Sequence, residues 1–488
     1  MPSKYTPKYK VVPLTVVLPV HLGSIDDLVQ GTKLCPDRIK VLLHQIYSLW
    51  IFDELNDKKR DGYFHQEGWV TLSAERLMFL LTNQYTKYEK FLEDNRIIEI
   101  KRTHNGAKSY VGGVRCTPYR INPRLLKPKN GRRFKHERIT DYKTLKAIQN
   151  DQAKFEKEQY ADEFHAITSF CSIHEKMEEM LADFYFDTDG LSKFVSKVGS
   201  GQIILEKRES IRGIIDAEMI AHLINDNSVP KPIVCSFGER FHSVFTRLPR
   251  EYRNFLHIKG VDEPLCSVDI ANCQPYLVSL IVNYPDVVEN ILPEFKPILN
   301  KISKLHLSKA IHYMDLCSTG KIYEFWLANR HTLTDRDEAK GEFIKRILFD
   351  SEQYQKKKYK LARETFKILF ADVAEAVSMM KTNNEHEFPL MKELFLDGQG
   401  KFAGKKHYHK TISCMCQRLE SRIMTGLIIP ALIKQDVGPF LSIHDSVLIP
   451  ESKSIIAQKI FKDCFVLLGV KPPTVKIDSY GVVSREWN

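Results

Sequence analysis

Two aspartates stand where carboxylates could bind a metal ion. Asp269 lies near the end of an apolar run that begins at Leu265, and Asp445 follows a second apolar run at residues 439–443. A charge at the end of a buried strand is costly unless it is paired or bound to a metal. Two such carboxylates would suit Mg²⁺, which keeps several waters and takes further ligands from substrate phosphates. Two ions held in this way can activate a hydroxyl and stabilise the leaving oxyanion of a phosphoryl transfer.

The neighbouring residues predict the elements that would hold this pair. Residues 265–270 are typical of a strand that feeds a helix at 272–281, with Asn272 as its cap and Pro275 in its first turn. Residues 439–449 indicate two strands with His444 and Asp445 at the bend. A lone aspartate at a strand end is usually a cap or turn residue. The two aspartates can therefore form one metal site only if the two strands lie side by side.

The N-terminal part carries a different pattern. Apolar residues at helical spacing predict helices over residues 36–91, with the pattern repeated at 69–81. Two short β-like runs, at 97–100 and 109–121, flank the tight turn signal of Asn105 and Gly106 and predict a hairpin. Helices followed by a hairpin outline a winged helix. We expect residues 1–123 to form a winged-helix-like module that binds nucleic acid.

A basic stretch follows this module. Residues 124–138 carry many cations and only one acid, Glu137, which suits contacts with phosphates. The alternative is a solvated linker. We expect a basic linker at 124–141, whose candidate contacts are Lys127, Lys129, Arg132 and Arg133.

Composition sets the remaining bounds. Lys plus Arg number 72 against 61 for Asp plus Glu, and this net charge of +11 favours a polyanionic partner. The cysteines form no CxxC pair and no zinc-type cluster, which indicates reduced thiols in a cytoplasmic protein. Pro13 and Pro19 interrupt the apolar run at 11–20, so we expect no export signal. No segment has the roughly 20 apolar residues that cross a bilayer, so no membrane partner is expected.

The C-terminal half resembles family A DNA polymerases and the related single-subunit RNA polymerases. Five segments are similar to that superfamily's motifs and follow its order; they are 238–243 with Arg253, 268–274, 336–349, 409–420 and 443–446. The resemblance covers about residues 235–488. It implies an α+β right-hand fold, with an antiparallel palm sheet and helical fingers and thumb. We expect a helical thumb-like or connecting region at 142–260, and a palm at 261–488 with fingers inserted at about 285–405.

The resemblance also implies roles for single residues. Asp269 and Asp445 would bind two Mg²⁺ ions, with Mn²⁺ as a substitute, and the backbone carbonyl of Ile270 would lie within reach. Lys340 would meet the incoming triphosphate and donate a proton to pyrophosphate. The alternative for Lys340 is a solvated helix face. The remaining nucleotide-binding candidates are Arg336, Phe349 and Gln274, and the nucleic-acid-binding candidates are Arg240, Arg253, Gln417 and His444.

Some positions depart from the pattern. Gln274 stands where the DNA polymerases carry Glu and the RNA polymerases carry Gly, and Ser446 matches the RNA enzymes. In the fingers helix, Asp350 replaces an expected Gly. The spacing from Lys340 to Phe349 is also one residue longer than usual. Gln274 still fills the space beside the sugar, which favours deoxynucleotides.

These features together predict a template-directed nucleotidyltransferase. We expect a DNA polymerase that extends a 3′-hydroxyl with deoxynucleoside triphosphates on a primer-template, for replication of a mobile element, plasmid or phage. The best Asp-x-Glu candidate, Asp216 and Glu218, lies too close to Arg240 for a proofreading nuclease domain, so we expect none. The alternatives are an RNA polymerase or primase of the same superfamily, or a non-catalytic DNA-binding initiator or regulator. The sequence leaves the template type, the primer requirement and the oligomeric state open.

Overall fold

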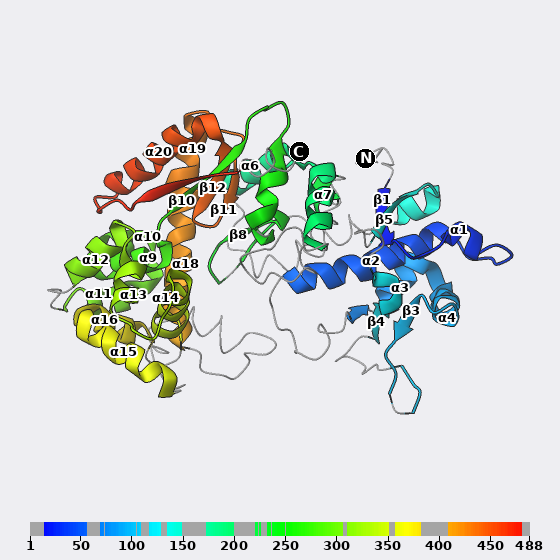
Figure 1. Cartoon of the computed structure of the whole chain (residues 1–488), viewed down its shortest axis with the longest axis horizontal. Coiled ribbons are helices and arrows are strands. Elements are labelled where there is room, and N and C mark those ends of the chain that lie inside the picture. Colours follow the sequence, from blue (N-terminus) through cyan, green and yellow to red (C-terminus); the bar gives the residue numbers. More distant parts are fainter. Residues whose placement is uncertain are drawn as a thin grey trace, which may run out of the picture.

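The protein combines helices with several small antiparallel sheets (Figure 1). The computed structural model describes residues 14–55, 69–72, 74–103, 105–108, 117–127, 134–148, 172–199, 220–222, 224–225, 232–235, 237–248, 250–305, 310–350, 357–381 and 408–480.

The N-terminal part packs helices against a three-stranded sheet in the order β2-β4-β3. Its helices are α1 (Ile25–Leu28), α2 (Pro36–Leu55), α3 (Ala74–Leu81) and α4 (Tyr85–Asp94), and its sheet contains β2 (Val70–Leu72), β3 (Ile98–Ile100) and β4 (Thr117–Ile121). The predicted antiparallel pairing of the hairpin is found between β3 and β4. The helix expected at 69–81 is wrong for residues 70–72, which pair with β4. The part of the hairpin at 109–116 lies outside the described residues.

The expected basic linker is partly built into this N-terminal part. Strand β5 (Phe134–Ile139) pairs antiparallel with β1 (Leu14–Pro19), with Leu14 opposite Ile139. A short 3-10 helix spans Pro123–Leu126. The linker interpretation is therefore wrong for residues 134–139, because long-range strand pairing and the burial of Ile139 fix them in a sheet.

The described residues of the region at 142–260 contain helices and short strands, and the expectation of a helical thumb-like or connecting region remains a prediction. This region contains α6 (Ser172–Leu181), α7 (Thr188–Gly199) and 3-10 turns at Val244–Arg247 and Arg250–Phe255. Two small sheets accompany them: β6 (Phe184–Phe186) pairs with β9 (Leu256–Ile258), and β7 (Ile233–Val234) pairs with β8 (Phe241–His242). The strands are short because Gly238 and neighbouring residues turn the chain back within a few positions.

The C-terminal part is built on a four-stranded antiparallel sheet in the order β11-β12-β10-β13. Its strands are β10 (Leu265–Ile270), β11 (Leu441–Ile443), β12 (Ser446–Pro450) and β13 (Val475–Ser479). Every residue of β12 is buried, as expected of a strand covered on both faces. The helix α20 (Ser454–Leu467) contacts β10 and β13, and Figure 1 shows it beside the sheet. The expected α+β class with an antiparallel sheet is confirmed.

The described residues between β10 and β11 are mainly helical. The helices are α9 (Cys273–Asn283), α10 (Pro285–Ile291), α11 (Lys296–Ile302), α12 (Ala310–Ser318), α13 (Ile322–Ala328), α14 (Arg336–Glu342), α15 (Lys357–Leu369), α16 (Ala371–Lys381), α18 (Thr411–Ile423) and α19 (Ile429–Lys434). Two stretches are π-helical, Phe343–Leu348 and Met424–Ile428. In Figure 1, α18 runs from the sheet alongside the helices α9–α16.

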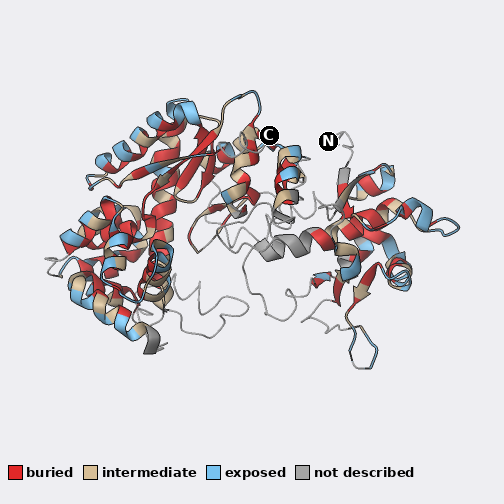
Figure 2. Cartoon of the chain, in the orientation of Figure 1, coloured by how far each residue is buried: buried red, intermediate tan, exposed pale blue. Residues whose placement is uncertain are grey.

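Buried residues form two hydrophobic clusters, shown as red segments in Figure 2. The first joins β10 and α9 to the helices that follow, around Trp326 and Phe343. The second joins the N-terminal elements to residues 184–258, and it includes Leu265, Leu441 and Leu448 from the four-stranded sheet. Within the described part of the chain, the cysteines are free thiols, and no helix is both long and apolar enough to cross a membrane.

Candidate active site

Asp269 and Asp445 meet at one end of the central strands of the sheet. Asp269 on β10 lies directly opposite Ser446 on β12, next to Asp445. The backbone N–H of Ile270 donates to the carbonyl oxygen of Asp445, with an N to O distance of 3.4 Å. His444 has a left-handed backbone, with a φ of 56°, and turns the chain between β11 and β12. Two carboxylates that lie far apart in the sequence are thus neighbours in space.

The two carboxyls destabilise each other's charged form. Burial raises the pKa of Asp269 to about 8, and the charges of Asp445 and Asp478 add to this effect. Burial also raises the pKa of Asp445. Lys340 opposes the shift at both aspartates. Burial therefore disfavours the charged carboxylates despite the nearby cations, and a divalent cation bound there would favour their charged form.

The helix α14 supplies a positive charge that acts on both aspartates. Lys340 is exposed on this helix, and its charge acts on Asp269 and on Asp445. Asp335 caps the helix, because its carboxylate accepts from the backbone N–H of Glu338 at 2.8 Å. An exposed ammonium that faces two carboxylates is free to bind a polyanionic ligand.

Arg336, one turn before Lys340, is tied to the strand-to-helix turn. Its Nη2 donates to Asn272 Oδ1 at 3.2 Å, and its Nε donates to Glu324 at 2.6 Å. Asn272 occupies the N-cap position before α9 as expected, with a left-handed φ of 54°, but its side chain caps no helix N–H. The predicted capping bond is therefore wrong, because the amide oxygen serves Arg336 instead. The buried Nδ2 of Asn272 makes no hydrogen bond within the described residues.

Phe349 ends the π-helical segment Phe343–Leu348 and is half-buried against the first hydrophobic cluster. A π-helical turn accommodates one more residue than an α-helical turn. The longer spacing between Lys340 and Phe349 coincides with this wide turn. The carbonyl of Ile347 accepts from the buried ammonium of Lys381 at 2.6 Å. The predicted stacking of Phe349 on a templating base remains a prediction.

Arg240 and Gln274 both bind Glu420, a buried carboxylate on α18. Arg240 donates through Nε and Nη2 to the two oxygens of Glu420, at 2.7 and 2.6 Å. The amide nitrogen of Gln274 donates to one of the same oxygens at 2.7 Å. Burial raises the pKa of Glu420 to about 7, with a further contribution from Asp445. The three side chains therefore link β8, α9 and α18 beside the aspartate pair.

The other predicted nucleic-acid contacts surround the same strand end. Arg253 donates to the hydroxyl of Tyr480 at 3.3 Å, and its charge lowers the raised pKa of Asp269. His444 stacks edge-on to His242, and burial followed by the charge of Arg240 lowers its pKa to about 3, so its ring is neutral. Gln417 on α18 lies so close to Gly238 that a Cβ there would be 2.5 Å from its amide oxygen.

The basic stretch is described only in part. Lys127 is exposed after the short 3-10 helix Pro123–Leu126. The other three predicted phosphate contacts, Lys129, Arg132 and Arg133, lie outside the described residues. Their role remains a prediction.

The residues present fit a divalent metal ion of the magnesium type. Over the described ranges no three His, Cys, Asp or Glu side chains form a ready-made metal cluster. Asp269 and Asp445 supply two hard oxygen donors, and Mg²⁺ needs only one or two carboxylates when phosphates and waters complete its shell. The raised pKa values of both aspartates are the effect that a bound cation would reverse.

Several residues around the site escaped sequence reasoning. Glu420 lies within a recognised segment, but its ion pair with Arg240 spans two distant parts of the chain. Asp478 on β13 raises the pKa of Asp269 and forms an ion pair with Arg250 at 3.0 Å. The alternation of β13 could have indicated that Asp478 projects from one face of the sheet. No local spacing could have indicated either partner.

Comparisons with known proteins show no relative in sequence and a distant likeness in structure. No protein-family model and no curated protein matches the chain. One solved structure that resembles it is the POL domain of Pol1 from M. smegmatis in complex with DNA primer-template and dNTP. The two share 10% sequence identity with a TM-score of 0.37, over 69% of this chain and 73% of that chain. A match this loose is a distant likeness to a DNA polymerase domain, and the family resemblance of the motifs remains a prediction.

Proposed function

We propose that the protein is a template-directed nucleotidyltransferase, and specifically a DNA polymerase without a proofreading exonuclease. The observation that carries this proposal is the meeting of Asp269 and Asp445 at one end of the sheet, where the charge of the exposed Lys340 acts on both. Two acidic oxygen donors beside a cationic helix suit a substrate that brings its own phosphates.

Asp269 and Asp445 would hold Mg²⁺ or Mn²⁺. When bound, such ions stabilise the charge that develops on the attacking and leaving oxygens of a phosphoryl transfer. The protein's own contribution is to fix the two carboxylates at adjacent strand positions and to keep their environment partly buried, which strengthens electrostatic interactions.

Lys340 and Arg336 would bind and orient the nucleoside triphosphate. Lys340 presents three donors on an exposed helix turn, where a compact charge can contact several phosphate oxygens and donate a proton to departing pyrophosphate. Arg336 is held by Asn272 and Glu324, which fixes the first turn of α14 relative to the turn after Asp269. Orientation of this kind lowers the barrier by removing the entropy cost of aligning the reactants.

Gln274 favours deoxynucleotides over ribonucleotides as substrates. Its amide nitrogen is engaged by Glu420, so the side chain is held in one orientation and still fills space beside the aspartates. A filled position disfavours an additional 2′-hydroxyl. RNA synthesis or priming is the second candidate, since Gln274 and Ser446 both depart from the pattern of the DNA enzymes.

Primer extension tests the proposal. The wild type is expected to add labelled deoxynucleotides to a primer-template in the presence of Mg²⁺, and ribonucleotides more slowly. Asp445→Asn is expected to reduce incorporation on the order of 1,000-fold, because one of the two acidic donors is lost. Asp315→Asn is the matched control, since it removes an exposed carboxylate that pairs only with Lys471 at the surface.

The outcomes separate the candidates. Faster use of ribonucleotides would favour RNA synthesis. Tight, strongly salt-dependent DNA binding with no incorporation of either nucleotide would favour a non-catalytic initiator or regulator. Equal incorporation by the wild type and Asp445→Asn would show that the activity belongs to a contaminant.

A further inference from the structure

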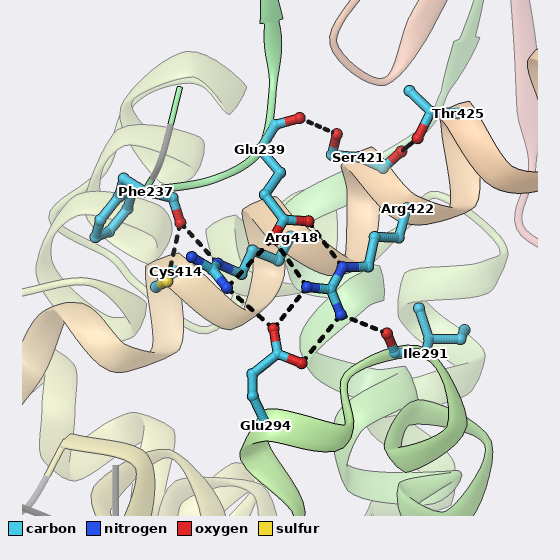
Figure 3. Close-up of polar contacts among 9 residues, drawn as sticks. All are labelled: Phe237, Glu239, Ile291, Glu294, Cys414, Arg418, Ser421, Arg422 and Thr425. Carbon is cyan, nitrogen blue, oxygen red and sulfur yellow. Dashed lines mark hydrogen bonds and ion pairs between the residues drawn. The ribbon is translucent and has the colours of Figure 1, made fainter. Parts of the chain in front are cut away.

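Four charged side chains, Glu239, Glu294, Arg418 and Arg422, form a network of ion pairs (Figure 3). Arg422 on α18 donates to both oxygens of Glu239, at 2.7 and 2.8 Å, and to both oxygens of Glu294, at 2.8 and 3.0 Å. Arg418, one turn earlier, donates to Glu294 at 3.0 Å and lies 3.3 Å from Glu239. The side chain of Arg418 is only 4% exposed. Two positive and two negative charges are thus balanced in a partly buried setting.

The same helix also holds the backbone of the turn that carries Glu239. Arg418 Nε donates to the carbonyl of Phe237 at 3.1 Å, and the hydroxyl of Ser421 donates to the carbonyl of Glu239. Between these two carbonyls lies Gly238, which approaches α18 too closely for a side chain. The turn between β7 and β8 is therefore fixed to α18 by side-chain and backbone contacts together.

Glu239 adopts a rarely populated backbone conformation in this arrangement. Its φ of 53° lies in the left-handed region, which a glutamate adopts rarely. Such conformations persist where the surrounding structure over-determines them, and they gather at functional sites. The contacts from Arg422 and Ser421 are the ones that hold this residue.

The network lies one residue away from the predicted site. Arg240 follows Glu239 directly and binds Glu420, which lies between Arg418 and Arg422 on α18. The charge of Arg240 in turn lowers the raised pKa of Asp445. Any shift of the turn along α18 would therefore move Arg240 relative to both acids.

Stability alone is a poor reason for such a network. A buried ion pair often adds no net stability over well-packed apolar residues of the same volume, although removal of one partner is destabilising. Its better-attested use is to specify one arrangement of the parts it joins. Here the parts are the β7–β8 turn, α18 and the turn before α11 that carries Glu294.

We infer that Glu239 and Arg422 are positioning residues, which act on the site through the Arg240–Glu420 pair. This inference rests on the proposed function, because it deepens the account of the same site. Within the described part of the chain, neither side chain forms a hydrogen bond or ion pair with the two aspartates. Their role is to set the register between the β7–β8 turn and α18.

Hydrogen exchange tests the positioning without substrate. The backbone N–H of Glu239 is bonded to the carbonyl of Cys235 at 2.8 Å, and that of Cys235 to the carbonyl of Arg240 at 3.1 Å. In Glu239→Gln we expect peptides covering residues 235–243 to exchange about tenfold faster, with β10 unchanged. Lys296→Gln is the control, since it removes only an exposed ion pair. Unchanged exchange at 235–243 would overturn the inference.

Kinetic measurements test whether this positioning affects nucleotide incorporation through the Arg240–Glu420 pair. Glu239→Gln is expected to lower kcat/KM for nucleotide incorporation about 10- to 100-fold at a temperature where the variant is folded. A small displacement of active-site groups can reduce the rate by this factor. Combined with Glu420→Gln, it should add almost nothing to the loss of Glu420→Gln alone, since both act through one pair. Additive losses, or a wild-type kcat/KM, would overturn the inference.

A milder variant tests the same inference in case Glu239→Gln does not fold. Ser421→Ala removes one hydrogen bond to the turn and keeps all four charges, so we expect the same pattern with a loss below tenfold. A wild-type protein that incorporates no nucleotide would overturn the proposed function and the catalytic half of this inference. The hydrogen-exchange result would then decide by itself whether Glu239 fixes the β7–β8 turn to α18.

Discussion

At the scale of single residues, the aspartate pair sets the pH response of the fold. The pKa of Asp269 is raised to about 8, chiefly by burial and then by Asp445. A carboxyl in the unfolded chain titrates near 4. Between these values the folded protein binds a proton that the unfolded chain has released, so the wild type loses stability as the pH rises from about 4 to 8.

Asp269→Asn is therefore expected to stabilise the protein. The gain in free energy of unfolding should be absent at pH 4, grow as the pH rises, and level off above pH 8 at about 5 kcal/mol or less, since the pKa shift is about four units at about 1.4 kcal/mol each. Urea denaturation of both proteins from pH 4 to 9 measures it. Mg²⁺ should stabilise the wild type and not the variant. A difference that does not vary with pH would contradict the electrostatic account.

The residues of the candidate site could be predicted only in part from the sequence. Asp269 and Asp445 could be selected because each follows an apolar run, and strand pairing then places them together. The partner of Arg240 could not be selected, since Glu420 lies on another element and no local spacing records a contact between distant segments. The same applies to Asn272, whose contact with Arg336 replaced the predicted helix cap.

At the scale of elements, the π-helical segment Phe343–Leu348 connects Lys340 to the hydrophobic core. The wide turn diverts backbone carbonyls from the usual α-helical pattern, and Lys381 on α16 satisfies that of Ile347. The segment thus depends on a donor from a neighbouring helix.

Lys381→Met is expected to destabilise the protein by about 1–3 kcal/mol, because it leaves the buried carbonyl of Ile347 without this donor. Thermal unfolding measures the loss. Lys360→Met on the exposed face of α15 is the control, because its pair with Glu364 is exposed and should matter little. Equal effects of both variants would contradict the assigned contact.

Element prediction failed where long-range pairing overrides local pattern. The apolar periodicity at 69–81 indicated a helix throughout, yet Val70–Leu72 pairs with β4. Residues 134–139 looked like part of a charged linker, yet their partner is β1 at the other end of the N-terminal part. The β10–α9 turn was predicted well, because a strand, a turn and a helix follow one another directly in the sequence.

At the scale of the whole molecule, the excess of cations predicts the salt dependence of DNA binding. Replacing Lys127, Lys129, Arg132 and Arg133 together by Ala should weaken duplex binding for all sequences. The slope of log affinity against log salt should flatten by about 3–4 units, close to one per lost phosphate contact. Fluorescence anisotropy across a salt series measures this. An unchanged slope would show that these four residues do not contact phosphates.

The expected domain boundaries do not coincide with the hydrophobic cores. The second cluster unites N-terminal strands and helices with residues 184–258 and with Leu265 and Leu448 of the four-stranded sheet. A boundary placed by composition at 123 or 260 therefore crosses shared apolar surface. Composition locates charged stretches, but it does not record which apolar faces meet.

The order of strands in the four-stranded sheet has a consequence for synthesis of the chain. Its central strand β10 is made early, whereas β12 and β13 on its two sides end at Pro450 and Ser479. A nascent chain on the ribosome holds Asp269 long before either flanking strand has emerged. The acidic centre therefore cannot assemble until β12 has been synthesised, and nascent chains that end before Asp445 contain no such centre.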